Sequence, residues 1–96
     1  MKLRWTPRAV ADLEEIADYL LSVSPTSWER LIGRIEAVAD YLLQFPHMGK
    51  VGLVTGTREF VLSGTPYIVV FRVREGIVQI LSIRDGRMQL PPTTWE

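Results

Sequence analysis

The stretch TPYIVVFRVREGIVQILSIRDGR, residues 65–87, constrains the fold most, because it contains two apolar runs separated by two turn residues. The runs are residues 67–74 and 77–84, and Glu75 and Gly76 form the turn between them. A two-residue turn fixes the pairing of an antiparallel hairpin. The sequence therefore predicts these cross-strand pairs: Arg74 with Ile77, Arg72 with Gln79, Phe71 with Ile80, and Tyr67 with Arg84.

Two amphipathic helices are predicted before this hairpin. Thr6 and Ser24 are each followed by proline, a combination typical of a helix cap and first helical position. Apolar residues then recur at helical spacing from Val10 to Leu20 and again from Trp28 to Leu42, and Pro46 ends the second run. We expect an antiparallel helix hairpin, preceded by a short strand at residues 2–5.

The rest of the chain is predicted to contain one more strand, at residues 57–62, after a loop QFPHMGKVG that is marked by proline and glycines. The fold class is therefore α+β, with the helix hairpin packed on a small antiparallel sheet in a single domain of residues 1–96. The tail of about residues 88–96, MQLPPTTWE, is too proline-rich to extend a helix or a central strand and is a candidate for flexibility.

The predicted pairing gives the strands at 67–74 and 77–84 two apolar faces. Two helices can cover only one face of a small sheet, so the other face needs the C-terminal tail, a second subunit or a partner segment. One face carries Ile68, Val70, Arg72, Arg74, Ile77, Gln79, Leu81 and Ile83; the other carries Tyr67, Val69, Phe71, Val73, Val78, Ile80, Ser82 and Arg84.

Composition excludes several classes of protein. With no cysteine and one histidine, a metal site is not expected. No apolar run is long enough for a transmembrane helix, and the N-terminus lacks the apolar region of a secretory signal, so we expect a cytoplasmic location and no membrane association. The net charge is zero and the pI about 6.6, which disfavours nucleic acid as a direct partner.

No catalytic motif is recognisable. His47 lies in the proline and glycine loop without a nucleophile or a second histidine, and is best interpreted as an ordinary loop residue. The carboxylates of the first helix fit a solvated face, and the scattered glycines do not form a phosphate-binding loop, so no cofactor is expected. The remaining cluster is a set of arginines near strand ends, with Glu59 and Asp85 as candidate partners: Arg58, Arg72, Arg74, Arg84 and Arg87.

Almost the whole chain resembles the RelE/ParE superfamily of bacterial type II toxins, and its ParE branch in particular. The resemblance is carried by WTPRAVADLEEIADYL, by SPTSWERLIGRIEAVADYLLQFPHMGK, and by GTREFVLSGTPYIVVFRVREGIVQIL. It implies a toxin that inhibits DNA gyrase by binding, without a catalytic set. It also implies a cognate ParD-like antitoxin that forms a hetero-oligomeric complex with the toxin and contacts operator DNA.

Two departures separate the chain from the RelE-like ribonucleases of the superfamily. Ile68 stands where those enzymes place an arginine, and the segment from Arg84 to Leu90 lacks their C-terminal histidine or tyrosine. These substitutions favour a binding protein. The alternatives are a ribosome-dependent mRNA endoribonuclease with Arg58, Arg72 and Arg87 as a relocated site, and a non-toxic co-repressor.

The resemblance also suggests two surfaces. For the antitoxin, we expect apolar anchors and ion-pair donors at Trp5, Arg58, Phe60, Tyr67, Phe71 and Arg72, although Phe71 is also a candidate core residue. For the toxic surface that contacts the target, we expect Arg84, Asp85, Arg87 and Trp95.

Overall fold

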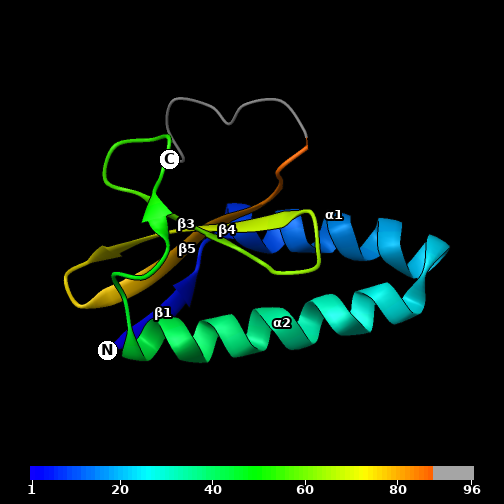
Figure 1. The fold of residues 1–96 in the computed structure, drawn as a ribbon, viewed down its shortest axis with the longest axis horizontal. Coiled ribbons are helices and arrows are strands. Elements are labelled where there is room, and N and C mark those ends of the chain that lie inside the picture. Colours follow the sequence, from blue (N-terminus) through cyan, green and yellow to red (C-terminus); the bar gives the residue numbers. More distant parts are fainter. Residues whose placement is uncertain (88–96) are drawn as a thin grey trace.

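Both helices begin at the predicted cap and proline pairs. The computed structural model describes residues 1–87, in which α1 spans Pro7–Val23 and α2 spans Pro25–Gln44. The Thr6 hydroxyl oxygen accepts a hydrogen bond from the Ala9 amide at 3.3 Å, and the Ser24 hydroxyl oxygen accepts one from the Ser27 amide at 3.4 Å. These bonds satisfy amides that have no partner inside the helix. The result is the expected antiparallel helix hairpin (Figure 1).

A five-stranded sheet, with strand order β1-β5-β4-β3-β2, completes the α+β fold. All neighbouring pairs are antiparallel except β1 and β5, which run parallel with Lys2 opposite Ile77. The loop predicted for residues 44–52 is interrupted by a two-residue strand, β2, at the sheet edge. The strands are β1 Lys2–Trp5, β2 Lys50–Val51, β3 Arg58–Val61, β4 Tyr67–Arg74 and β5 Ile77–Asp85.

The β4–β5 turn has the geometry that its sequence predicts. Glu75 and Gly76 both have positive φ, 54° and 74°, as in the two-residue hairpin turns whose twist matches that of the strands. The predicted pairing is confirmed from Arg74 opposite Ile77 as far as Phe71 opposite Ile80.

Beyond Phe71 the predicted register is wrong, because a β-bulge lies between Val70 and Phe71 and leaves Leu81 without an opposite residue. Tyr67 therefore pairs with Asp85 and not with Arg84. An extra residue reverses the alternation of side chains along the rest of the strand. As a result Ile83 joins the core beneath the helices, whereas Arg84 lies on the opposite face of the sheet.

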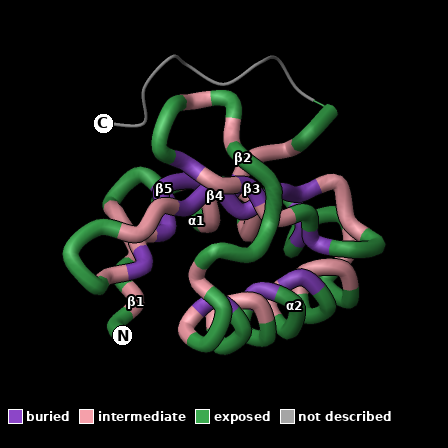
Figure 2. Tube along the Cα trace, turned by 60° about the vertical axis from the view of Figure 1, so that its left-hand side comes forward, coloured by how far each residue is buried: buried purple, intermediate pink, exposed green. Residues whose placement is uncertain are grey.

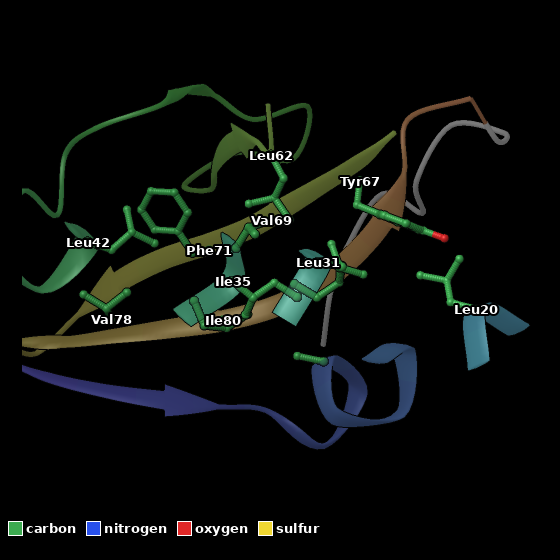
Figure 3. Packing of buried hydrophobic residues seen from close by; sticks show 12 residues of the cluster. Leu20, Leu31, Ile35, Leu42, Leu62, Tyr67, Val69, Phe71, Val78 and Ile80 are labelled. Atoms are coloured by element: carbon green, nitrogen blue, oxygen red, sulfur yellow. The ribbon is translucent and has the colours of Figure 1, made fainter. Parts of the chain in front are cut away.

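The main core lies between the helix hairpin and one face of the sheet (Figure 3). Leu31, Ile35 and Leu42 of α2 point toward the central strands, where Phe71 has no exposed surface. Burying one large apolar side chain stabilises a fold by about 1.5–3 kcal/mol relative to leaving it exposed. The hairpin therefore derives its position from one continuous apolar layer, and Figure 2 shows the buried residues concentrated on β4, β5 and one side of α2.

The opposite face of the sheet has its own small apolar cluster of Ile68, Val70 and Leu81. Val54, from the loop between β2 and β3, packs against it, so part of the cover that this face requires comes from residues 52–57 of the chain itself. The predicted contribution of the tail lies outside the described residues.

A buried ion pair crosses this second face. Glu59 of β3 is 2% exposed and accepts a hydrogen bond from the Arg84 guanidinium at 3.1 Å. The other Glu59 oxygen accepts a bond from the Leu53 amide at 3.3 Å, which ties the 52–57 loop to the sheet. Charged groups are buried at a cost unless they are paired, so Arg84 and Glu59 depend on each other.

We expect Arg84→Ala to destabilise the fold by about 3–5 kcal/mol, because it leaves the Glu59 carboxylate buried without its partner. The free energy of unfolding from urea denaturation tests this. Arg87→Ala, which removes an exposed guanidinium three residues away, is the matched control and should shift the urea midpoint much less than Arg84→Ala does, because exposed ion pairs contribute little to stability. Equal stability of Arg84→Ala and the unchanged chain would show that the pair is not structurally required.

Candidate functional site

One end of the sheet meets the tip of the helix hairpin, and several polar and aromatic side chains gather there. Tyr67 begins β4 opposite Asp85, the last residue of β5. The Gly86 amide donates to the Pro66 carbonyl at 2.8 Å, and a Cβ on Gly86 would lie 2.9 Å from Ile68 Cδ1. Glycine therefore permits the close approach that holds the end of β5 beside the start of β4.

Asp85 and Arg87 form a clamp at this end. The Arg87 Nε and Nη2 atoms donate to the two Asp85 carboxylate oxygens at 3.0 and 2.8 Å, and the Arg87 amide donates to Oδ1 at 2.8 Å. The hydrogen bond from the Arg87 side chain lowers the pKa of Asp85 below its ordinary value, and the same bond raises the pKa of Arg87. Both groups are therefore charged at neutral pH and are held in a defined orientation.

Tyr67 is the third titratable group at this end of the sheet. Burial raises the pKa of its phenol, and the nearby charge of Asp85 raises it further. The phenol is consequently protonated at neutral pH. Asp85, Arg87 and Tyr67 thus form a surface of fixed charge and hydrogen-bonding character.

Two cavities open beside these residues. The first, here called the tip cleft, has a volume of about 290 Å³ and lies between the tip of the helix hairpin and the β3–β4 turn. The second, the side cleft, has a volume of about 260 Å³ and lies between α1 and the ends of β4 and β5. They share Tyr19 and Tyr67, and so form one depression.

Asp12 in the side cleft accepts hydrogen bonds from Ser82 and from the Ile83 amide, which fixes α1 to β5.

A third cavity lies on the β3 side of α2. This α2–β3 groove has a volume of about 320 Å³ and is lined by Ala37, Val38, Tyr41, Met48 and Phe60. The Tyr41 ring lies 6.1 Å from the Phe60 ring and 5.0 Å from the Phe45 ring, measured between centroids. These distances are typical of aromatic pairs that stabilise each other. Phe60 was expected at an interface from the sequence, whereas Tyr41, Phe45 and Met48 were not.

The residues predicted to contact an antitoxin do not form one patch. Phe60 lines the α2–β3 groove and Arg58 lies two residues earlier on the same strand, but Trp5 is half-buried on β1 at the opposite edge of the sheet.

Phe71 is fully buried, so its ring belongs to the core and offers no surface to a partner. Tyr67 is also buried, at 7% exposure, and Arg72 donates to the Gln79 side chain at 2.7 Å.

The predicted target surface is only partly assembled. Asp85 and Arg87 lie together as the clamp, but Arg84 points to the far face of the sheet, where it pairs with Glu59. The β-bulge places the Arg84 side chain on the face opposite to the predicted one. There Arg84 has a structural role, as the partner of Glu59. Trp95 lies outside the described residues. Both predicted ion-pair partners, Glu59 and Asp85, are confirmed.

Three further observations on residues 1–87 concern the histidine, groups of metal-ligating side chains and membrane-spanning helices. His47 is exposed in the loop after α2 and lines none of the three cavities. Within residues 1–87, no group of three His, Cys, Asp or Glu side chains is arranged to hold a metal ion. Neither helix of this part is long and apolar enough to cross a membrane.

Comparison with known proteins assigns the fold to a family. The sequence profile described as "ParE toxin of type II toxin-antitoxin system, parDE" matches residues 3–90. The protein named "Putative toxin Y4kP" from Sinorhizobium fredii is 36% identical over 90 residues, which cover 94% of this chain and 93% of the relative. "Toxin RelE2" from Caulobacter vibrioides is 39% identical over 82 residues, covering 85% and 91%.

A solved structure agrees with these relatives. The structure titled "Chromosomal ParDE TA system from P. aeruginosa" contains a chain that superposes with a TM-score of 0.75 at 31% identity, covering 88% of this chain and 95% of that one. The helix hairpin, the mostly antiparallel sheet and the match along nearly the whole sequence lead to one assignment: the chain belongs to the ParE family of type II toxin-antitoxin toxins.

Proposed function

We propose that this toxin inhibits a type II topoisomerase, DNA gyrase, by binding to it, and that a cognate ParD-like antitoxin neutralises it. The observation that carries the binding mechanism is the clamp. Arg87 is bound by both oxygens of Asp85, and Tyr67 beside them has a raised pKa. Acid–base catalysis near neutral pH is most efficient with a group whose pKa lies near that pH, and the pKa shifts of Tyr67 and Asp85 point away from it. A binding surface requires only fixed charges and shape.

The second candidate function, cleavage of mRNA, is less well supported. A ribonuclease must deprotonate or otherwise activate the 2′-hydroxyl, and the pKa shifts of Tyr67 and Asp85 move both groups away from neutrality. Ile68 stands where RelE-like enzymes place an arginine, and it is buried, with 9% of its surface exposed. Of these three arginines, Arg58, Arg72 and Arg87, only Arg87 lines one of the three cavities described above, the tip cleft, so the cavities do not bring the three side chains together.

An antitoxin partner is supported by exposed apolar side chains on this small domain. Tyr19 and Val23 are 61% and 59% exposed at the tip cleft, and Phe45 and Met48 are 49% and 39% exposed beside the α2–β3 groove. Apolar surface gathered around cavities is typical of protein interfaces. The chain has zero net charge, so contact with operator DNA is assigned to the antitoxin and not to this chain.

Purified toxin is expected to block supercoiling by gyrase and to trap cleaved DNA, and the antitoxin should relieve both effects. Agarose-gel supercoiling and cleavage assays measure these outcomes. Primer extension on mRNA after induction is the parallel measurement, and no new cuts within codons are expected. Cuts within codons together with unaffected gyrase would replace the proposal by the ribonuclease alternative.

The clamp predicts a defined pH behaviour. Asp85 has a folded pKa below the ordinary 3.8, so its stabilising contribution is present above that pH and is lost as the pH falls through the folded pKa. In Arg87→Ala, the Asp85 pKa should rise toward its ordinary value, as followed by NMR titration of the carboxyl carbon. The same variant should retain its fold and lose growth arrest. Full growth arrest by folded Arg87→Ala would remove the clamp from the toxic surface.

A further inference from the structure

Four cations lie together on the sheet face that the helices leave uncovered. In β1, β4 and β5, alternate residues such as Leu3, Val73 and Val78 pack against the main core. The residues between them therefore point to the opposite face. In the register of the sheet they form two rows across β1, β5 and β4, which are Arg4, Gln79 and Arg72 in one row and Lys2, Ile77 and Arg74 in the other.

These cations, here called the basic patch, are Lys2, Arg4, Arg72 and Arg74. Neighbouring strands are about 4.8 Å apart and alternate residues of one strand about 7 Å apart, so the four Cα atoms form a rectangle of roughly 10 by 7 Å. The Arg72 Nε atom donates to the Gln79 side chain at 2.7 Å, which fixes the direction of one guanidinium group.

The basic patch and the clamp lie at opposite ends of β4. The N-terminus and the β4–β5 turn meet at one end of the sheet, where the Lys2 amide donates to the Gly76 carbonyl at 3.4 Å (Figure 1). The clamp of Asp85 and Arg87 lies at the other end, where β4 begins. The sheet thus carries two separate charged surfaces.

The charges of the basic patch are not neutralised by the rest of residues 1–87. None of its four cations forms an ion pair there, and Glu59 on the same face is already paired with Arg84. The zero net charge of the chain hides this arrangement, because acidic side chains gather on the helix layer. The two helices carry Asp12, Glu14, Glu15, Asp18, Glu29, Glu36 and Asp40. The helix layer is therefore acidic, whereas the end of the uncovered sheet face is basic.

Protection of the sheet edge does not account for the whole patch. A cation on an edge strand discourages pairing with another chain, which is a sufficient reason for Lys2 and Arg4 on β1. Arg72 and Arg74 lie on β4, which is the central strand of the sheet. Two cations on a central strand indicate a partner that the face itself binds.

The composition of the two rows favours a phosphate backbone as that partner. Protein interfaces are built around apolar or aromatic anchors, whereas nucleic-acid interfaces are more polar and strongly positive. Ile77 is the one apolar side chain in the two rows, and neither row contains an aromatic residue. Single-stranded nucleic acids bind largely by stacking bases on aromatic side chains, so the rows favour a duplex contacted along its phosphates.

We propose that the basic patch binds the phosphate backbone of duplex DNA, and that this DNA is the segment held by the target topoisomerase. The phosphate contact rests on the charges and their register, and the choice of this DNA rests on the proposed function. With the clamp against the enzyme and the patch against its DNA, one toxin molecule contacts both partners. Two linked contacts stabilise the enzyme–DNA complex more than either contact alone. Operator DNA remains the partner of the antitoxin.

The salt dependence of DNA binding tests the patch. Purified toxin is titrated into a short fluorescent duplex, and anisotropy gives the affinity at several salt concentrations. Four phosphate contacts predict a slope of about −3.6 for log K against log[salt], and Arg4→Gln with Arg74→Gln should reduce it to about −1.8. The matched control, Arg30→Gln with Arg34→Gln, removes the same charge from exposed positions on α2 and should keep the slope of the unchanged chain.

Three results would overturn the proposal. The first is no binding of the duplex by the unchanged toxin at low salt. The second is an equal loss of slope in both double variants, which would mean that only net charge matters. The third is stronger competition by polyglutamate than by unlabelled duplex of the same charge, which would assign the patch to an acidic protein. Circular dichroism melting confirms that each variant is folded.

The gyrase supercoiling assay separates this inference from the proposed function. The Arg4 and Arg74 variant should need about 10- to 100-fold more toxin than the unchanged chain for the same inhibition. Equal inhibition by the two would mean that the patch is not used in the target complex, while the proposed function stands. Binding of the duplex through the patch by a toxin that leaves gyrase active would retain the phosphate contact and reject gyrase as the target.

Discussion

The β4–β5 hairpin is the element on which the other parts of this fold depend. Its two-residue turn places Phe71 opposite Ile80 at the centre of the sheet, β1 adds to one side of it and β3 to the other. The single bulge near Val70 then decides which residues of the last half of β5 face the helices. Ile83 completes the main core because of that bulge, and Arg84 meets Glu59 for the same reason. One extra residue in β5 therefore determines both that Ile83 joins the main core and that Arg84 forms the buried ion pair.

The helices and the turn could be predicted from the sequence because their signals are local. A cap residue followed by proline fixes a helix start at Thr6 and at Ser24 through contacts within a few residues. Glu75 and Gly76 fix the hairpin turn in the same way. The bulge, the parallel pairing of β1 with β5, and the two-residue strand β2 have no local signal. They arise from tertiary contacts, such as the hydrogen bond from the Thr6 hydroxyl to the Ile80 carbonyl at 2.9 Å.

The candidate site, like the fold, was predictable from the sequence only where the signal is local. Asp85 and Arg87 are two residues apart at a strand end, and their pairing follows from that spacing. Arg84 was assigned to the wrong face because its direction depends on the bulge, and Phe71 was included among anchors because burial is not visible in a single sequence.

The central claim is that this toxin acts as a rigid binding surface at the end of the sheet. Hydrogen–deuterium exchange of the toxin, measured alone and with gyrase, tests it most directly. We expect gyrase to slow exchange at residues 84–87 and in the β3–β4 turn, because the clamp and the tip cleft would be covered, while exchange in the core strands stays unchanged. Unchanged exchange at residues 84–87 in a complex shown to form, or protection confined to the β1 edge, would contradict the account.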